Sequence, residues 1–229
     1  MTDTLHAPTS AERPPAQAPA SDAQVSVVGE RKEPPPSRIT WEDFLAWADE
    51  STRAEWVDGE VIVLSPSNVV DLRLISFLHR VLAAFVEARQ LGEIFLMDLL
   101  MRLETRPSGR EPDLVFIATE HLDRLKDTYL DGPADLAVEV VSPDSDVRDR
   151  SEKFREYEGA GIPEYWLLDP IRREALFYRL GDDGRYHLVP IGEDGLFRSV
   201  VLPGFTLRIA WLWQRPLPAV TDVMRQVGV

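Results

Sequence analysis

The stretch LAVEVVSPDSDVRDRSEK, residues 136–153, decides the fold because it joins a buried strand to a polar helix. Residues 135–141 alternate in facing direction as a strand does, and one of the two faces is wholly apolar. Glu139 lies on the other face, inside an apolar run where an unpaired carboxylate is costly. Asp149 and Lys153 follow on a short helix, and their spacing of four places both on one side. The stretch therefore predicts a buried carboxylate with a lysine as its candidate partner.

Length and composition indicate an ordinary globular protein. The chain has 229 residues, of which 44% are hydrophobic and 28% charged, which is enough for one domain with a real core. It has no cysteine, which excludes disulfides, thiolate metal sites and a cysteine nucleophile. The net charge of −14 argues against loose, non-specific binding to nucleic acid, but it is compatible with a site built of carboxylates. No apolar run approaches the roughly 20 residues that span a bilayer, and no secretory signal is visible. We therefore expect a cytoplasmic protein with no membrane partner.

Three parts of the chain differ in composition. Residues 1–37 are rich in proline and alanine and poor in large apolar residues, which predicts a disordered tail. Residues 38–213 carry the periodic apolar patterns and are expected to form a single domain. Residues 214–229 are interpreted as a C-terminal extension.

The order of the predicted elements indicates the class of fold. A helix begins at Thr40, a tight turn at Asp58–Gly59 joins two strands, and a long helix over 69–88 is closed by Gly92. From this helix onward the order is helix, strand, strand, strand, helix, strand. This order predicts an α/β fold of the α+β, mixed-sheet kind, with extra β-hairpins after it. The expected strands are 93–104, 112–119, 134–142 and 164–170, with a loop over 105–111 and later hairpins around 183–184 and within 196–209.

A second carboxylate is predicted to meet Glu139. Asp113 stands at the start of the strand over 112–119, and if this strand neighbours 134–142, Asp113 and Glu139 converge at one point of the sheet. Two such oxygen ligands suit a hard divalent cation, and Lys153 nearby could orient a water or stabilise charge on a phosphate. The residues alone leave other interpretations open. Asp113 also fits a loop edge, and Asp149 with Lys153 also fits a surface ion pair.

Three segments carry a resemblance to a known family. The segments AEWVDGEVIVLSP, PDLVFIAT and LAVEVVSPDSDVRDRSEKFREYEGAGIPEYWLLDP resemble the Uma-type restriction endonuclease family, a branch of the PD-(D/E)XK nuclease superfamily. The resemblance covers roughly residues 40–210. It implies an endonuclease-like domain that hydrolyses DNA with Mg²⁺, or with Mn²⁺ in its place. It also implies that Asp113 and Glu139 bind the metal and that both act with Lys153 in catalysis.

The chain departs from the superfamily pattern two residues after Glu139. A lysine is expected there, and Val141 occupies the position. In the Uma-type family the lysine lies on the next helix in a D-x-x-x-K pattern, which Asp149 and Lys153 reproduce. A long, flexible lysine side chain makes this displacement physically reasonable.

Two further positions are lower-ranked candidates for the site. Family members carry a histidine where the long helix begins, and this chain has Asp71 at or near that place. Asp71 either serves as a further metal ligand or marks an altered site. Glu55 matches a family glutamate, although a carboxylate that flanks a turn is an equally good interpretation.

Three functions remain open from the sequence. The first is a Mg²⁺-dependent endonuclease that acts on DNA. The second is a catalytically degenerate nuclease fold that serves as a binding or interaction module, which the net charge and Val141 favour. The third is another metal-dependent phosphoesterase, with a nucleotide or RNA substrate. A homodimer is plausible because double-strand cleavage needs two sites. Arg102, Arg106 and Arg110 could contact DNA phosphates, but a solvated loop face is the preferred interpretation.

Overall fold

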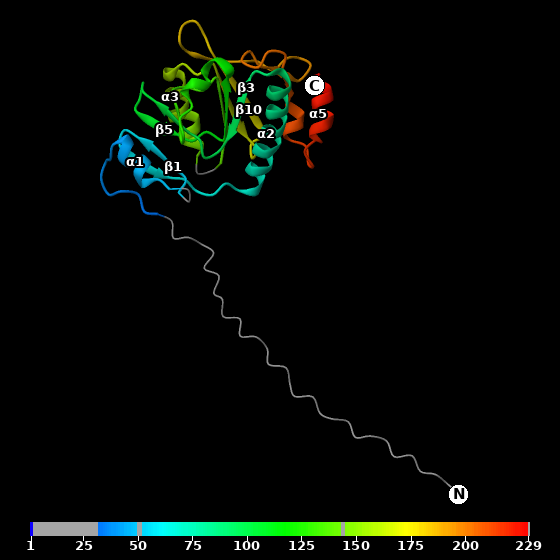
Figure 1. The fold of residues 1–229 in the computed structure, drawn as a ribbon. Coiled ribbons are helices and arrows are strands. Elements are labelled where there is room, and N and C mark those ends of the chain that lie inside the picture. The colour runs from blue at the N-terminus through cyan, green and yellow to red at the C-terminus, as the bar shows by residue number, and fades with distance from the viewer. Residues whose placement is uncertain (2–31, 50–51, 143–144, 229) are drawn as a thin grey trace. The chain divides into compact units, whose positions relative to one another are not determined.

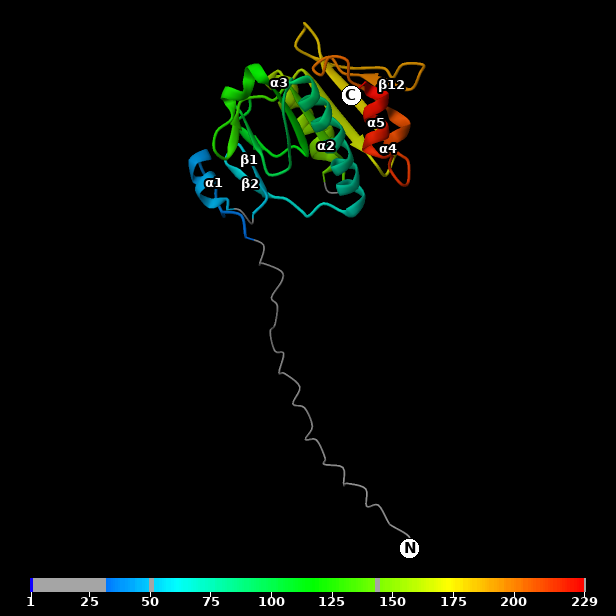
Figure 2. The ribbon, with the colours of Figure 1, turned by 45° about the vertical axis from the view of Figure 1, so that its right-hand side comes forward.

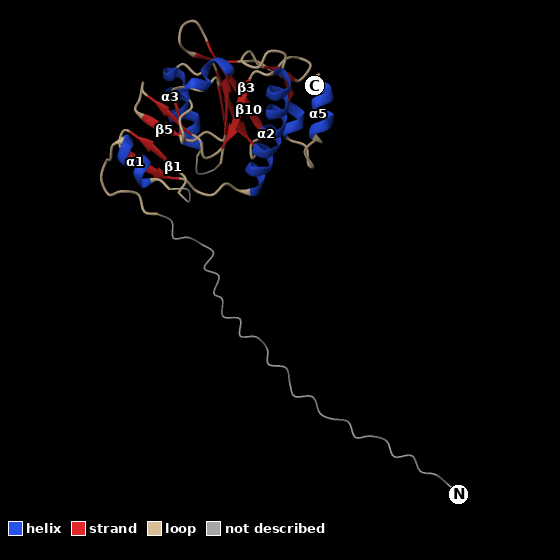
Figure 3. Cartoon of the chain, in the orientation of Figure 1, coloured by secondary structure: helices blue, strands red, loops and turns tan. Residues whose placement is uncertain are grey.

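A six-stranded mixed sheet forms the centre of the fold (Figure 3). Its strand order is β11-β10-β9-β8-β6-β3, in which β8 and β9 are parallel and the other neighbours antiparallel. With α2 before β3 and α3 before β9, the core follows the predicted order of helix, strand, strand, strand, helix, strand, and the predicted fold class is confirmed. The elements are α2 (Val69–Arg89), β3 (Gly92–Leu96), β6 (Leu114–Ala118), β8 (Leu136–Val140), α3 (Phe154–Ala160), β9 (Glu164–Asp169), β10 (Glu174–Leu180) and β11 (Tyr186–Leu188).

The structure is a computed structural model, and it describes residues 1, 32–49, 52–142 and 145–228 (Figure 1). Most of the predicted tail, residues 1–37, lies outside these ranges, so its predicted disorder stays a prediction. Lys32–Val229 forms one compact unit. In the described part of the chain, no helix is long and apolar enough to cross a membrane.

The two faces of the central sheet bury different helices, because successive residues of each strand point to opposite sides. Leu136, Val138 and Val140 of β8 pack with the buried side of α2 in one apolar cluster. Ala137 and Val141 belong to a second cluster on the other face, which α3 covers. The predicted alternation around Glu139 is therefore correct.

The C-terminal segment belongs to the same apolar core. The short helix α4 (Ile209–Leu212) and α5 (Val220–Val227) pack on the α2 side of the sheet, and α5 lies beside α2 (Figure 2). The apolar side of α5, formed by Val223, Met224 and Val227, is buried. The segment interpreted as a C-terminal extension thus completes the cover of the central sheet.

A second, five-stranded sheet lies on the N-terminal side of the unit, with the order β2-β1-β5-β4-β7. The predicted first helix and the turn at Asp58–Gly59 are present, and Trp41 of this helix packs against Trp56 of β1. Gly109 faces Trp41 so closely that an added Cβ would lie 2.2 Å from the ring, so this position requires glycine. The elements are α1 (Trp41–Trp47), β1 (Ala54–Val57), β2 (Glu60–Val63), β4 (Leu100–Leu103), β5 (Ser108–Arg110), the 3₁₀ helix η1 (Thr119–Arg124), and β7 (Tyr129–Asp131), with the separate hairpin β12 (Leu196–Arg198) and β13 (Thr206–Arg208).

Several predicted boundaries are wrong. The strand expected over 93–104 is two strands, β3 and β4, because the chain turns at Asp98, which has a φ of 72°, and passes from one sheet to the other. Apolar residues stand on both sides of Asp98, so the sequence pattern does not separate the two strands. The loop expected over 105–111 contains β5, and the left-handed residue that ends α2 is Gln90, not Gly92. Gly92 instead begins β3, where it lies against the backbone of Ile117.

Candidate active site

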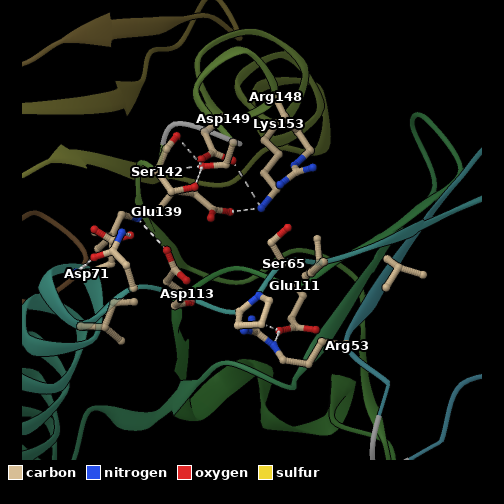
Figure 4. A pocket seen from close by; sticks show the side chains of 18 residues that line it. Arg53, Ser65, Asp71, Glu111, Asp113, Glu139, Ser142, Arg148, Asp149 and Lys153 are labelled. Carbon is tan, nitrogen blue, oxygen red and sulfur yellow. Dashed lines mark hydrogen bonds and ion pairs between the residues drawn. The ribbon is translucent and has the colours of Figure 1, made fainter. Parts of the chain in front are cut away.

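Asp113 and Glu139 come from neighbouring antiparallel strands and meet across them. Leu114 of β6 pairs with Val138 of β8, and the same register places Asp113 opposite Glu139. Asp113 is held by a 2.7 Å hydrogen bond that its Oδ2 accepts from the backbone N–H of Val140. Both carboxylates line one cavity of about 300 Å³ (Figure 4). The structure therefore brings together the two acids whose convergence the strand pattern predicts.

Lys153 reaches the same point from the segment after β8. It ends η2 (Arg148–Lys153), which is a π-helix and not the first turn of the predicted α-helix. Its Nζ lies 2.8 Å from Oε1 of Glu139 and 3.6 Å from Oδ1 of Asp149. Lys153 is only 3% exposed, so its ammonium group depends on these carboxylates for solvation. Isolated π turns of this kind occur frequently at functional sites.

Glu55 completes the surroundings of the lysine. It lies in the middle of β1, is fully buried, and places Oε1 2.9 Å from Nζ of Lys153. Its other oxygen, Oε2, accepts a 2.8 Å hydrogen bond from Nη1 of Arg110. Glu55 is therefore a buried partner of Lys153, and its membership of a functional site stays a prediction.

The charges of this cluster are strongly perturbed. Burial raises the pKa of Asp113 to about 7, although the hydrogen bond from Val140 and the charge of Lys153 both act to lower it. Burial also raises the pKa of Glu139 well above its usual range, and the nearby Asp149 and Asp113 add to this effect. For Glu55, burial acts in the same direction, but Lys153, Arg110 and Arg148 outweigh it and lower the pKa to about 2.

Lys153 stays protonated in this environment. Burial by itself lowers its pKa, but the charges of Glu139, Glu55 and Asp149 outweigh burial and raise the pKa above its ordinary value. The surrounding carboxylates therefore favour the positively charged form of the lysine.

Asp71 and Asp149 also line the cavity. Asp71 is 3% exposed, and burial raises its pKa to about 6, while Asn68 donates a hydrogen bond to its Oδ2. The Oδ1 atoms of Asp71 and Asp149 are buried and have no hydrogen-bond partner among the described residues. The cavity thus holds buried carboxylate oxygens with unused acceptor capacity.

A buried ionic network supports Glu55 from behind. Arg110 of β5 is 0% exposed and donates hydrogen bonds of 2.7 Å to both carboxylate oxygens of Glu156. Because Arg110 also binds Glu55, it links α3 to β1 beneath Lys153. The interpretation of the three arginines before the PD strand as a solvated face is therefore wrong for Arg110. Arg106 is also engaged, with Asp58 and with Glu156.

Sequence reasoning missed Tyr157 and the pair of Arg53 with Glu111. The hydroxyl of Tyr157 donates a 2.8 Å hydrogen bond to Oε1 of Glu139, the same oxygen that Lys153 contacts. Its position four residues after Lys153 was an available signal, because it places both side chains near one helical face. Arg53 forms an ion pair with Glu111 at the wall of the cavity, and no sequence pattern pointed to this pair.

The donor set fits a hard cation that completes its coordination elsewhere. Across the described ranges, no group of three or more histidine, aspartate or glutamate side chains is spaced to hold a metal ion by itself. Mg²⁺ is commonly held by one or two carboxylates, with waters and substrate phosphates as the other ligands. The pair of Asp113 and Glu139, beside the Oδ1 atoms of Asp71 and Asp149 that lack a hydrogen-bond partner among the residues the structure describes, matches that arrangement.

Comparisons with known proteins match the chain to a family model and to a solved structure. The family model Uma2, described as "Putative restriction endonuclease", matches residues 41–210. Among solved structures, the fold is similar to one titled as a putative nuclease belonging to DUF820 from Anabaena variabilis ATCC 29413. The TM-score is 0.65 at 18% sequence identity, over 76% of this chain and 97% of that one. No curated protein sequence matches the chain.

Proposed function

The chain belongs to the Uma2 restriction endonuclease family, and from that premise we propose that it is a Mg²⁺-dependent endonuclease that hydrolyses phosphodiester bonds of DNA. One observation carries the proposal. Asp113 and Glu139 project from paired strands into one cavity, and a buried Lys153 lies 2.8 Å from Glu139. Two carboxylates and a fixed positive charge are the groups that metal-assisted phosphodiester hydrolysis needs.

Asp113 and Glu139 would hold the metal, Mg²⁺ or Mn²⁺. A bound divalent ion supplies a more acidic water and polarises the phosphate oxygens. The strand pairing fixes the two carboxylates relative to each other, and the Val140 N–H orients Asp113. Tyr157 and Lys153 both bind Oε1 of Glu139, which leaves Oε2 as its available oxygen.

Lys153 would act through its charge. The charges of Glu139, Glu55 and Asp149 raise its pKa, which favours the protonated form. It can orient the attacking water or stabilise negative charge that develops on the phosphate. Its position therefore supports the role that the superfamily gives to a lysine at the place of Val141.

Calorimetric titration of the full chain with Mg²⁺ and Mn²⁺ tests the metal assignment. The double variant Asp113→Asn/Glu139→Gln should lose the binding seen in the wild type, while its circular dichroism spectrum stays unchanged. The matched control is Glu87→Gln/Glu93→Gln, which removes two exposed carboxylates and should bind as the wild type does. Equal binding in all three proteins would contradict the assignment.

Cleavage of plasmid and linear duplex DNA tests the activity itself. Glu139→Gln and Lys153→Met should each reduce metal-dependent cleavage by at least about a hundredfold, because electrostatic groups at a reacting centre contribute factors of this size. If the folded wild type binds the metal but cleaves no DNA, an RNA or nucleotide substrate becomes the next assay. If it neither binds metal nor cleaves, the chain is a degenerate nuclease fold that serves in binding.

A homodimer is part of the proposal, since cutting both strands of a duplex requires two active sites. Sedimentation of the full chain with and without duplex DNA tests this. A monomer under both conditions would restrict the activity to nicking one strand.

A further inference from the structure

A groove with three arginines runs along the outward face of α2. Val69, Leu72, Arg73 and Arg80 share that face, because their spacing of three, four and eleven residues follows the helical repeat. With Arg215 and Pro216 of the segment before α5, they line a groove, which we call the arginine groove. Val69 and Leu72 are 61% and 39% exposed, so the groove also presents apolar surface to solvent.

The positive charge of this groove is not neutralised. Arg73, Arg80 and Arg215 are exposed, and none of them forms an ion pair with a carboxylate in the described part of the chain. Arg80 and Arg215 donate to backbone carbonyls, which leaves their charge available. Every residue that lines the groove is neutral or basic. In a chain of net charge −14, a local concentration of unpaired arginines calls for an anionic partner.

The arginine groove begins at the helical turn that lines the catalytic cavity. Val69 lines the groove, while Asn68 and Asp71 line the cavity. Along α2, Arg73 and Arg80 are seven residues apart, which corresponds to about 10 Å of helix. The two arginines are therefore far enough apart to contact different phosphates of one DNA strand, which follow one another with a rise of about 3.4 Å along the duplex axis. A strand with one phosphate in the cavity would thus find its neighbouring phosphates within reach of the groove.

We propose that the arginine groove binds the phosphodiester backbone of the nucleic acid beside the phosphate that is cleaved. The inference rests on the proposed nuclease function, because that function places one phosphate of the strand in the cavity. Binding to the groove can be measured without cleavage. Arginine suits this role because its planar guanidinium group forms paired hydrogen bonds with phosphate oxygens. Contacts of this type position a nucleic acid without reading its sequence.

The test is the salt dependence of DNA binding by the full chain. A fluorescein-labelled 20-base-pair duplex of mixed sequence is titrated by anisotropy, with every protein carrying Glu139→Gln to prevent cleavage. The groove variant is Arg73→Ala/Arg80→Ala/Arg215→Ala. The matched control is Arg38→Ala/Arg185→Ala/Arg198→Ala, which removes the same charge from exposed arginines that are each paired with a carboxylate.

The groove variant should bind at least about tenfold more weakly at low salt, and its slope of log affinity against log salt should fall by about 2 to 3. The control should change the slope by less than about 1. Two results would contradict the proposal that the groove binds the phosphodiester backbone. One is equal slopes in the two triple variants, and the other is no binding of the duplex by the Glu139→Gln protein at low salt.

Cleavage measurements separate this inference from the proposed function. With Glu139 intact, the groove variant should raise KM about tenfold and change kcat less than about twofold, because the groove binds away from the reacting phosphate. If DNA binding depends on the groove but no metal supports cleavage, the nuclease function is contradicted and the role of the groove in binding is supported. If the groove variant cleaves DNA with an unchanged KM, the nuclease function is supported and the role of the groove is contradicted.

Discussion

At the scale of single residues, Glu55 shows how a buried charge is stabilised by its partners. Its carboxylate is fully buried, yet its pKa is lowered from 4.5 to about 2, because Lys153, Arg110 and Arg148 outweigh the effect of burial. A carboxyl group whose pKa is lower in the folded than in the unfolded state stabilises the fold above its unfolded pKa. That contribution is lost as the pH falls toward the folded pKa. Here the difference corresponds to about 3 kcal/mol at neutral pH.

The variant Glu55→Gln tests this coupling. We expect the free energy of unfolding to be lower than that of the wild type by about 3 kcal/mol at pH 7, and this difference should shrink as the pH falls from 4.5 toward 3. Urea denaturation over pH 3 to 7 measures it. Glu60→Gln is the control, since Glu60 pairs with Arg38 at the surface and should change stability by less than about 1 kcal/mol at every pH. A difference for Glu55→Gln that does not vary with pH would refute the coupling.

At the scale of elements, Arg110 holds three of them in place. It lies on β5, binds Glu55 of β1 and is paired with Glu156 of α3, all three side chains being buried. The two glutamates come from elements that share no backbone hydrogen bonds with each other. The position of Lys153, just before α3, therefore depends on an ionic contact between Arg110 and Glu156, which are 46 residues apart in the chain.

Replacement of Arg110 by Met should lower the free energy of unfolding by about 3–5 kcal/mol, because it removes the buried cation that pairs with both Glu55 and Glu156. Thermal and urea unfolding measure the loss. Arg185→Met is the matched control, since Arg185 is 73% exposed in its pair with Glu158 and should cost less than about 1 kcal/mol. A similar loss in both variants would mean that the buried network contributes no more than a surface pair.

At the scale of the whole molecule, the C-terminal helix α5 closes the apolar core over α2. Val223, Met224 and Val227 are buried there, in the segment that the sequence pattern assigns to an extension beyond residue 213. The helix is short but amphipathic, and its contact with α2 shows that its apolar side joins the core.

A chain that ends at Trp213 should therefore be less stable than the full chain by several kcal/mol, since burial of each such side chain contributes about 1.5–3 kcal/mol. The midpoint of thermal unfolding measures this. The control Asp222→Ala/Arg225→Ala removes an exposed ion pair on the opposite side of α5 and should leave the midpoint nearly unchanged. An equal midpoint for the full and the shortened chain would show that α5 is dispensable.

Local patterns in the sequence determined the elements of the core and the three central candidates. The two-residue period of strands placed Glu139 on the face opposite Leu136, and the PD motif located Asp113 at a strand start. The spacing of Asp149 and Lys153 predicted that a lysine on the following helix lies close to Asp149 and to the two strand carboxylates. These inferences succeeded because each depends on residues within one element or on two adjacent strands. The catalytic roles of these residues stay predictions.

Only the tertiary structure decided what surrounds these candidates. Periodicity is the same on both sides of the corner at Asp98, so the change of sheet between β3 and β4 has no local signal. Arg110 and Glu55 are in contact although they are 55 residues apart in the chain. An arginine in a polar segment is interpreted as solvent-exposed when its distant partners are not known. Likewise, the arginine groove exists only because the segment before α5 folds back onto α2. Burial and charge pairing depend on contacts between distant segments, and the order of residues along one segment does not specify them.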